Sequence, residues 1–332
     1  MSDPGRRWLR KVRPVAGSAR RPGRGTVDRM IEVTRLTKRY GPTTAVDGLS
    51  FTVRPGHVTG FLGPNGAGKS TTLRLILGLD APTAGTATID GRPFRGRRRG
   101  LRDAGALLDA TAVPAGRSAA AHLAALARSN GLPASRVAAV LEQVGLAAVA
   151  GKRVGDFSLG MKQRLGIAAA LLGDPGVLIF DEPVNGLDPE GIRWVRGLFR
   201  GLAAEGRTVL VSSHLMSEME HTADHLIVIG RGQLIADTPV AVFVERGARS
   251  HVALRTPSPA ALTVALATAG GSVTPGPDGL LEVTGLTAAE VGDLALAAGL
   301  ALHELAPRRA SLEDAFMELT ADSVDYLAGE LS

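Results

Sequence analysis

Residues 63–70 place a lysine and a serine after three glycines in the pattern Gly-x-x-x-x-Gly-Lys-Ser. An apolar, β-rich run precedes this stretch at residues 58–62, and residues 71–77 have the composition of a helix. A glycine-rich loop between a strand and a helix can point consecutive N–H groups at an anion and let the backbone approach it closely. The helix start adds unpaired N–H groups and the positive end of its dipole.

This loop is predicted to cradle the phosphates of a nucleotide. Lys69 would place its charge at the β- and γ-phosphates, and Ser70 would offer a hydroxyl ligand to Mg²⁺. The alternative is an ordinary glycine-rich turn. The loop glycines and their neighbours complete the predicted cradle: Gly63, Pro64, Asn65, Gly66, Ala67, Gly68 and Thr71.

Two carboxylates follow an unalternated apolar run at residues 177–180, which is typical of a strand buried on both faces. Because ligands bind at the carboxyl ends of strands in open α/β sheets, these side chains are candidates for chemistry. Asp181 could hold Mg²⁺ through water, and Glu182 could orient a water molecule or accept its proton. A solvated acidic pair is the alternative. His214 follows another buried run at residues 209–213 and is predicted to lie at the same edge.

The whole chain has 332 residues, which predicts two domains, and its 45% hydrophobic content is that of a globular protein. It contains no Cys, so disulfides and thiolate metal sites are excluded, which suits a cytosolic protein. No run has the length and apolar character of a membrane-spanning helix. Membrane contact is therefore expected through a partner.

The basic charge is concentrated at the start of the chain. Residues 1–29 carry nine basic and two acidic side chains, whereas the whole chain has a net charge of +6. This segment is rich in Arg, Gly and Pro and is predicted to be disordered, with contact to anionic lipid or RNA as an alternative. The basic isoelectric point thus describes a tail, and no nucleic-acid partner is expected. A second basic run, residues 92–102, is predicted to be a solvated loop, with partner or lipid contact as its alternative.

The remaining segments predict the architecture. Two strands alternate at residues 31–34 and 49–53, and Tyr40 lies beside a Gly-Pro turn where it could stack on a base or pack on the surface. A buried strand at residues 105–108 ends at Asp109, and residues 118–150 read as helical.

Residues 240–332 read as strand, helix, two strands, helix, strand and a terminal helix at 311–320. That order is typical of a ferredoxin-like unit, which we interpret as a regulatory or dimer-supporting domain.

These pieces, in this order, resemble the ATP-binding subunit of an ABC transporter over about residues 30–238. Residues 63–70 look like its Walker A motif and residues 177–181 like Walker B. The resemblance implies that Glu182 is the general base, His214 the switch histidine and Tyr40 the aromatic that stacks on adenine. It further implies nucleotide contacts at Val46, Ser158, Gly160 and Asp188.

Two positions depart from the family pattern. Residues 158–163 read Ser-Leu-Gly-Met-Lys-Gln where the family has Leu-Ser-Gly-Gly-Gln, so Ser158 and the second glycine, Gly160, are kept. Asp109 stands where the family has a glutamine that meets Mg²⁺. Both departures, with residues 311–316, look like the subgroup that pairs with ABC-2-type permeases and exports drugs, antibiotics or lipids.

The predicted fold is an α/β P-loop NTPase core with an N-terminal antiparallel β subdomain, a helical signature subdomain at about 110–172 and a small ferredoxin-like C-terminal domain. The predicted divisions are a basic extension at 1–29, an ATP-binding domain at 30–238 and an accessory domain at 239–332. The resemblance implies ATP and Mg²⁺ as cofactors, with the metal at Ser70, Asp109 and Asp181.

The implied activity is ATP hydrolysis that powers a membrane exporter from its cytoplasmic face. The implied partners are an ABC-2-type permease and a second ATPase subunit, identical or paired, with ATP closed between the two. One alternative is a soluble ABC-type ATPase that remodels a ribosome or nucleic-acid complex, although the chain has a single P-loop and no sustained heptads. Another is a regulatory nucleotide-binding module without hydrolysis, which the presence of both Glu182 and His214 disfavours.

Overall fold

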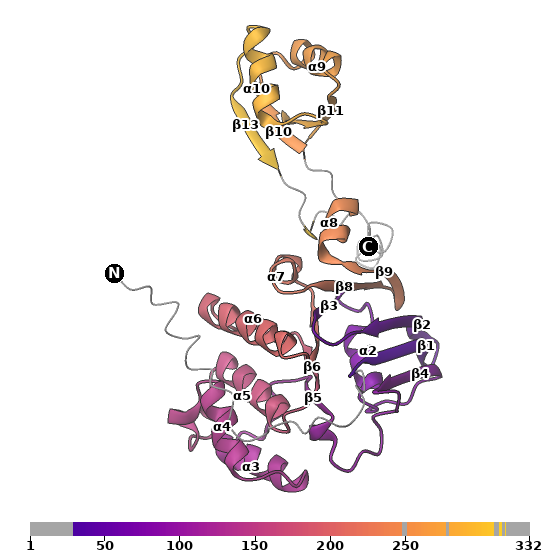
Figure 1. The fold of residues 1–332 in the computed structure, drawn as a ribbon, viewed down its shortest axis with the longest axis vertical. Coiled ribbons are helices and arrows are strands. Elements are labelled where there is room, and N and C mark those ends of the chain that lie inside the picture. The colour runs from indigo at the N-terminus through magenta and orange to yellow at the C-terminus, as the bar shows by residue number, and fades with distance from the viewer. Residues whose placement is uncertain (1–28, 248–250, 277–278, 309–311, 314–315, 317–332) are drawn as a thin grey trace. The chain divides into compact units, whose positions relative to one another are not determined.

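The computed structural model describes residues 29–247, 251–276, 279–308, 312–313 and 316 (Figure 1). The chain separates into two compact units. The first runs to His214 and resumes over Thr222–Asp237, whereas the second consists of Leu215–His221 and the chain from Thr238 onward. The predicted basic extension lies outside the described residues, apart from Arg29.

A six-stranded sheet forms the centre of the first unit, in the order β5-β6-β7-β3-β8-β9. The pairs β5–β6, β6–β7, β7–β3 and β3–β8 are all parallel. Every residue of β3 and β7 is buried, which explains why these segments show no alternation of apolar and polar residues. Since parallel strands end at the same edge, the polar residues that follow β3, β6 and β7 are brought together. The strands are β3 (Val58–Leu62), β5 (Ala104–Leu107), β6 (Val177–Asp181), β7 (Thr208–Ser213), β8 (His225–Gly230) and β9 (Gln233–Pro239).

A three-stranded antiparallel sheet, in the order β2-β1-β4, forms the predicted N-terminal β subdomain. Its strands are β1 (Ile31–Tyr40), β2 (Thr43–Val53) and β4 (Ala84–Ile89). The first two are longer than predicted, because a turn at Gly41, with φ +57°, joins them directly. Helix α2 (Lys69–Ile76) buries Leu73, Leu75 and Ile76 in the apolar cluster that these strands share with the central sheet.

The helical part of the first unit contains α3 (Ala119–Ser129), α4 (Ser135–Gln143) and α5 (Leu159–Leu171). Ser118 and Ser158 cap α3 and α5 by accepting N–H groups from Ala121 and Met161, each at 3.2 Å. Both serines therefore mark the helix starts locally in the sequence. The first unit also contains α6 (Pro189–Ala204) and the 3-10 turns η1 (Gly100–Arg102), η2 (Ala147–Val149) and η3 (Val154–Asp156). Helices α7 (Met216–Glu220) and α8 (Val240–Gly247) belong to the second unit.

Arg97 and Arg102 of the basic loop at residues 92–102 donate hydrogen bonds to backbone carbonyl oxygens. Arg97 donates to the carbonyl oxygens of Ile89 at 2.5 Å and Arg92 at 3.0 Å, and it pairs with Asp103 at 3.2 Å. Arg92, like Arg95, Arg98, Arg99 and Arg102, is exposed. Arg102 is also anchored, because it donates to the carbonyl oxygen of Gly131 at 2.8 Å. These two arginines hold the loop, and the other exposed arginines form a solvated surface, as the sequence predicted.

The second unit contains a four-stranded antiparallel sheet in the order β11-β12-β10-β13. With its two helices this is the predicted ferredoxin-like arrangement, in which β12 lies between β10 and β11. Its own apolar core includes Leu254, Leu262, Leu266 and Val291. The elements are β10 (His251–Arg255), α9 (Pro259–Thr268), β11 (Ser272–Pro275), β12 (Leu281–Thr284), α10 (Ala288–Ala297) and β13 (Glu304–Arg308). Most of the predicted terminal helix at 311–320 lies outside the described residues.

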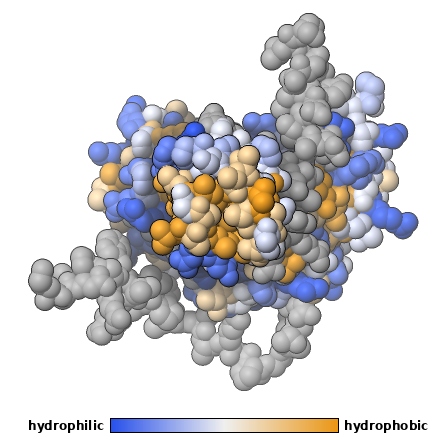
Figure 2. Space-filling view, turned by 90° about the horizontal axis from the view of Figure 1, so that it is seen from above, coloured by the Kyte–Doolittle hydropathy of each residue, from blue (hydrophilic) through white to orange (hydrophobic). Residues whose placement is uncertain are grey.

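The helices of this lobe also carry apolar side chains on their outer surface. Val264 of α9 is 67% exposed and Leu296 of α10 is 80% exposed. Apolar residues gather near the centre of the face that Figure 2 shows. Of the helices within the described ranges, none combines the length and the apolar character needed to span a bilayer.

Candidate functional site

The loop between β3 and α2 is held by close backbone contacts. A side chain at Gly63 would place its Cβ 2.5 Å from the carbonyl oxygen of Ile229, and one at Gly68 would place it 2.4 Å from that of Ala45. Gly68 also has φ +100°, which disfavours any other residue. No side chain caps α2, and its first turn has no acidic residue. The N-terminal N–H groups of α2 are therefore suited to an anion.

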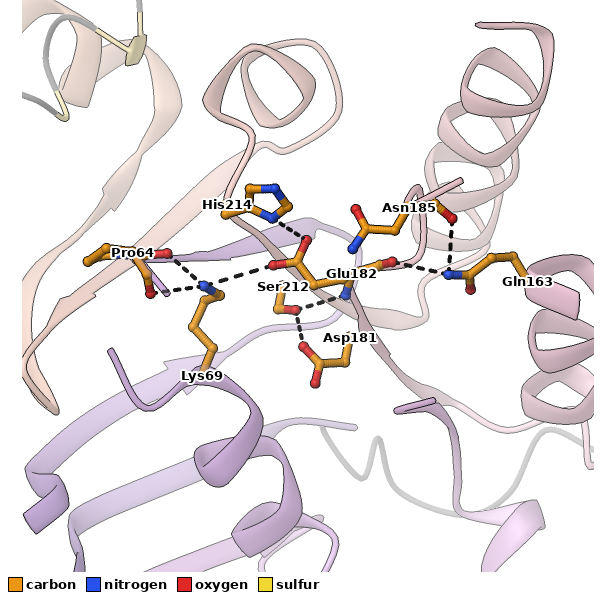
Figure 3. Close-up of polar contacts among 9 residues, drawn as sticks. Pro64, Lys69, Gln163, Asp181, Glu182, Asn185, Ser212 and His214 are labelled. Carbon is orange, nitrogen blue, oxygen red and sulfur yellow. Dashed lines mark hydrogen bonds and ion pairs between the residues drawn. The ribbon is translucent and has the colours of Figure 1, made fainter. Parts of the chain in front are cut away.

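Lys69 is the buried cation of this loop, with 7% of the residue exposed. Its Nζ donates to the carbonyl oxygens of Gly63 at 2.6 Å and Pro64 at 3.2 Å, and it lies 3.9 Å from Oε1 of Glu182 (Figure 3). Burial lowers the pKa of Lys69, whereas the carboxylates of Glu182 and Asp181 raise it in part. The ammonium group thus sits between the phosphate loop and the acidic end of β6.

Glu182 occupies a constrained turn immediately after β6. Its φ is +47°, in the left-handed region that non-glycine residues rarely adopt. Its backbone N–H donates to Oγ of Ser212 at 3.0 Å, and Ser212 in turn donates its hydroxyl hydrogen to the carboxylate of Asp181. On the side chain, Oε2 lies 2.8 Å from Nδ1 of His214. Three elements therefore converge on Glu182: the phosphate loop, the end of β6 and the end of β7 (Figure 3).

The start of α5 contacts the loop that follows Glu182. Gln163 is buried, and its amide nitrogen donates to the carbonyl oxygens of Glu182 at 3.4 Å and Asn185 at 3.3 Å. Sequence reasoning missed both Gln163 and Ser212 as residues of the site. The available signals were weak: Ser212 is a polar residue at the end of a buried strand, and Gln163 is a polar residue on an otherwise apolar face of α5.

Other predicted site residues cap a helix, are exposed to solvent or are buried in the apolar cluster. Asp188 caps α6 by accepting the N–H of Gly191 at 2.8 Å, and Ser70 is exposed at the start of α2. Asp109 is exposed and accepts the N–H and hydroxyl of Thr111 at 2.7 and 2.6 Å, which lowers the pKa of its carboxyl. The side chain of Val46 is fully buried in the apolar cluster, so its contact with a nucleotide stays a prediction.

Tyr40 lies away from these contacts, at the end of β1. It is 49% exposed, with the Nζ of Lys38 4.8 Å from its ring centroid. Its hydroxyl donates to Asp80 at 3.3 Å, and Arg74 donates to both oxygens of the same carboxylate at 2.7 and 3.1 Å. Burial and Asp80 raise the pKa of Tyr40, so its hydroxyl keeps its proton at neutral pH. The ring is thus available to a planar ligand while its hydroxyl is anchored.

Within the described ranges no group of three or more His, Asp or Glu side chains could hold a metal ion. Magnesium in nucleotide sites usually takes only one or two protein ligands and completes its shell with phosphate oxygens and water. The exposed hydroxyl of Ser70 and the carboxylates of Asp181 and Asp109 are therefore a donor set of the right chemistry for a phosphate-bound Mg²⁺.

Comparison with known families assigns the two parts of the chain to different models. Residues 46–185 match the model described as ABC transporter. Residues 153–220 match one described as an AAA domain, putative AbiEii toxin, Type IV TA system, which overlaps the first match. Residues 250–313, in the ferredoxin-like lobe, match a domain of unknown function (DUF8746).

Among curated relatives, the bacitracin transport ATP-binding protein BcrA of Bacillus licheniformis is 45% identical over 213 residues, which are 63% of this chain and 70% of the relative. The lantibiotic transport ATP-binding protein SrtF of Streptococcus pyogenes is 38% identical over 63% of this chain and 90% of the relative. The Nod factor export ATP-binding protein I of Paraburkholderia xenovorans is 40% identical over 71% of this chain and 80% of the relative.

Solved structures agree with these relatives. An ATP-binding subunit of an ABC transporter superposes with a TM-score of 0.60 at 28% identity, over 65% of this chain and 92% of that one. The cbiO1 protein of Clostridium perfringens, part of the ABC transporter complex cbiONQ, gives 0.58 at 29% identity, over 66% and 92%. The relatives support the transporter prediction over a soluble remodelling ATPase. The chain belongs to the ATP-binding subunits of ABC transporters, and it is an ATP-binding ATPase with an α/β P-loop fold.

Proposed function

We propose that this chain hydrolyses ATP to power an exporter of the drug, antibiotic or lipid class. The observation that carries the ATPase site is the convergence of Lys69, Glu182 and His214 at the carboxyl edge of the central sheet. The substrate class is supported by relatives named for bacitracin transport, lantibiotic transport and Nod factor export.

In the proposed reaction a water molecule attacks the γ-phosphorus, and the bond to the oxygen of ADP breaks. Glu182 takes the proton of that water, and His214 orients the glutamate through its ring nitrogen. A carboxylate only accepts hydrogen bonds, so Nδ1 of His214 carries the proton in this contact and Nε2 is left for another partner. Lys69 would exchange two carbonyl oxygens for phosphate oxygens and stabilise the charge that develops there.

Magnesium fits the donor set of this site. Ser70 and Asp181 would hold the ion, with Asp109 as a further carboxylate from the end of β5. When bound, Mg²⁺ would neutralise phosphate charge during transfer. The lowered pKa of Asp109 keeps its carboxyl ionised at neutral pH, so it can act as a ligand in place of the family's glutamine.

Nucleotide recognition is proposed to extend from the phosphate loop to Tyr40, whose exposed ring would stack on adenine. Loop residues 63–70 and Thr71 would supply the phosphate contacts, with Val46 beneath the loop. Stacking on this ring would add affinity for the nucleotide without selecting one base over another, because it makes no hydrogen bond to the edge of the base.

We further propose that two ATPase subunits close over ATP. Ser158 and Gly160, at the start of α5, would meet the γ-phosphate held by the partner's loop, and Asp188 would lie at the same interface. Helix starts suit anions, and that of α5 is capped only by its own serine. An ABC-2-type permease would bind the helical region and hold the chain at the cytoplasmic face of the membrane. The ferredoxin-like lobe would act as an accessory or regulatory domain.

The test is Glu182→Gln in the full-length chain, with Glu142→Gln on the exposed surface of α4 as the matched control. Hydrolysis by Glu182→Gln should fall by at least about a hundredfold, because the general base is lost, while ATP binding is kept. An ATP-dependent pull-down of this variant with mild detergent should recover a polytopic membrane protein.

Two outcomes would contradict the proposal separately. Normal turnover by Glu182→Gln would remove Glu182 as the base. Recovery of ribosomes or nucleic acid without a membrane protein would overturn the transport assignment, whatever the ATPase result. Loss of activity in Glu142→Gln as well would show that the charge change itself, rather than the site, disturbs the enzyme.

A further inference from the structure

Gln163 is a buried polar residue that the ATPase mechanism above does not use. Only 6% of it is exposed, and its amide nitrogen donates to the carbonyl oxygens of Glu182 and Asn185. Two carbonyl partners require the NH₂ group, so the contacts fix the orientation of the amide. Its Oε1 is buried without a hydrogen-bond partner among the described residues. An unpaired buried oxygen is unfavourable, so a nonpolar side chain of the same length would suit the packing alone better.

The turn that Gln163 contacts is itself strained. Glu182 adopts a left-handed conformation, which a non-glycine residue keeps only where its surroundings impose it. Ser212 accepts the N–H of Glu182 and Gln163 donates to its carbonyl oxygen. The backbone of this residue is therefore held on both sides, by the end of β7 and by α5.

The same end of α5 packs against the loop beyond Glu182. A Cβ at Gly186 would lie 2.2 Å from Cδ2 of Leu159, so the leucine rests directly on that glycine. A Cβ at Gly160 would lie 3.3 Å from Cδ2 of Leu187. Because the side chains of the two segments are in such close contact, a displacement of one segment is transmitted to the other. Residues 158–163 and the loop at residues 182–187 thus form one contact unit.

We propose that Gln163 is a positioning residue for Glu182, and that it couples the start of α5 to the glutamate of the same chain. This inference rests on the proposed function, in which Ser158 meets the nucleotide of a second subunit. When ATP held by the partner contacts the start of α5 in one chain, the position of Glu182 in that same chain's site would change. The two hydrolytic sites would communicate through a side-chain amide.

The test compares Gln163→Met with Gln163→Glu in the full-length chain. Methionine keeps the length and removes both donors, so kcat should fall about tenfold while KM for ATP stays within about twofold. The phosphate loop is unchanged in this variant, so ATP binding should be unchanged too. Gln143→Met and Gln143→Glu on the exposed surface of α4 are the matched controls and should behave as wild type.

The glutamate variant adds a pH signature that general damage would not produce. A buried carboxyl facing two carbonyl oxygens has a raised pKa, and its neutral form can donate one hydrogen bond whereas the carboxylate repels both oxygens. The kcat of Gln163→Glu relative to wild type should therefore rise at least about threefold between about pH 8 and about pH 6. The same ratio for Gln163→Met should stay constant over that range.

Several results would overturn the inference. One is a rise in KM with unchanged kcat, and another is a pH-independent ratio for a folded Gln163→Glu variant. If that variant does not fold, wild-type kcat in Gln163→Met overturns the inference and a fall in kcat at constant KM supports it. Glu182→Gln, measured in parallel, distinguishes failure of the proposed function from failure of this inference. Normal turnover by Glu182→Gln refutes Glu182 as the base. If Glu182→Gln is inactive while both Gln163 variants keep the wild-type kcat, only the coupling is refuted.

Discussion

Two glycines of the phosphate loop differ in the space around them, so Gly66→Ala and Gly68→Ala should destabilise the fold to different extents. Both residues adopt a left-handed backbone conformation, with φ +80° at Gly66 and φ +100° at Gly68. No atom lies within 4 Å of a Cβ added at Gly66, whereas one added at Gly68 would lie 2.4 Å from the carbonyl oxygen of Ala45. The first substitution therefore meets only backbone strain, and the second meets strain and a backbone clash.

The free energies of unfolding should separate accordingly. Left-handed backbone in alanine costs about 1–2 kcal/mol, which is the whole expected loss for Gly66→Ala. For a domain of this size that loss lowers Tm by about 2–8 °C. Gly68→Ala adds overpacking of about 1–3 kcal/mol and should lose about 2–5 kcal/mol in total. Gly116→Ala is the control, because its added Cβ also meets nothing within 4 Å and its φ is not positive.

ATP binding should not follow the order of stability. A Cβ added at Gly66 would meet no protein atom within 4 Å beyond its chain neighbours, and the polyphosphate is the proposed ligand of this part of the loop. Gly66→Ala should therefore lose at least about tenfold in ATP affinity although its fold is only mildly weakened.

The assay is thermal unfolding without nucleotide, followed by titration of a fluorescent ATP analogue. Equal losses of Tm in Gly66→Ala and Gly68→Ala would refute the steric reasoning, and wild-type affinity in Gly66→Ala would refute the position of the phosphates.

Three further outcomes are expected. Lys69→Met should weaken ATP binding at least about tenfold, since a phosphate loses its buried cation, and unchanged affinity in a titration would contradict the cradle. Tyr40→Phe should keep KM for ATP within about twofold and Tyr40→Ala should raise it about tenfold, because stacking needs the ring and not the hydroxyl; equal KM values would remove Tyr40 from the site. Hydrogen bonds from Thr287 lower the pKa of Glu290, so its carboxylate stabilises α10 above the ordinary glutamate pKa and ceases to do so as pH falls through the lower folded value. The difference in α10 amide protection between wild type and Glu290→Gln should accordingly shrink as pH falls below the ordinary glutamate pKa of about 4.3. A difference that stays constant from neutral pH to about pH 3 would refute this capping contribution.

Much of the fold could be predicted because the signals are local. The runs that became β3, β6 and β7 are mostly apolar and do not alternate, since both faces of a central parallel strand are covered. The helix start at Ser158 and the turn at Gly41 are likewise each indicated by a single residue type. Strand lengths were harder: β1 and β2 extend beyond their alternating cores because pairing with each other continues to the turn.

One division of the chain could not be foreseen. Helix α7 groups with the second unit although it follows His214 directly, and Glu220 at its end accepts the N–H of Leu312 at 3.3 Å. These residues are far apart in the sequence, and no periodic pattern connects them. Only packing between the two segments brings them into one unit.

By itself the sequence determined the phosphate loop, the carboxylates at the end of β6 and the histidine after β7, because each depends on residue types within one short segment. Tertiary structure decided what those residues touch. Lys69 meets Glu182, Ser212 bridges Glu182 to Asp181, and Gln163 reaches the same turn from α5. Such contacts follow from the lateral order of the strands and from the seating of α5 on the sheet, which depend on the packing of the whole unit and leave no pattern in any one segment.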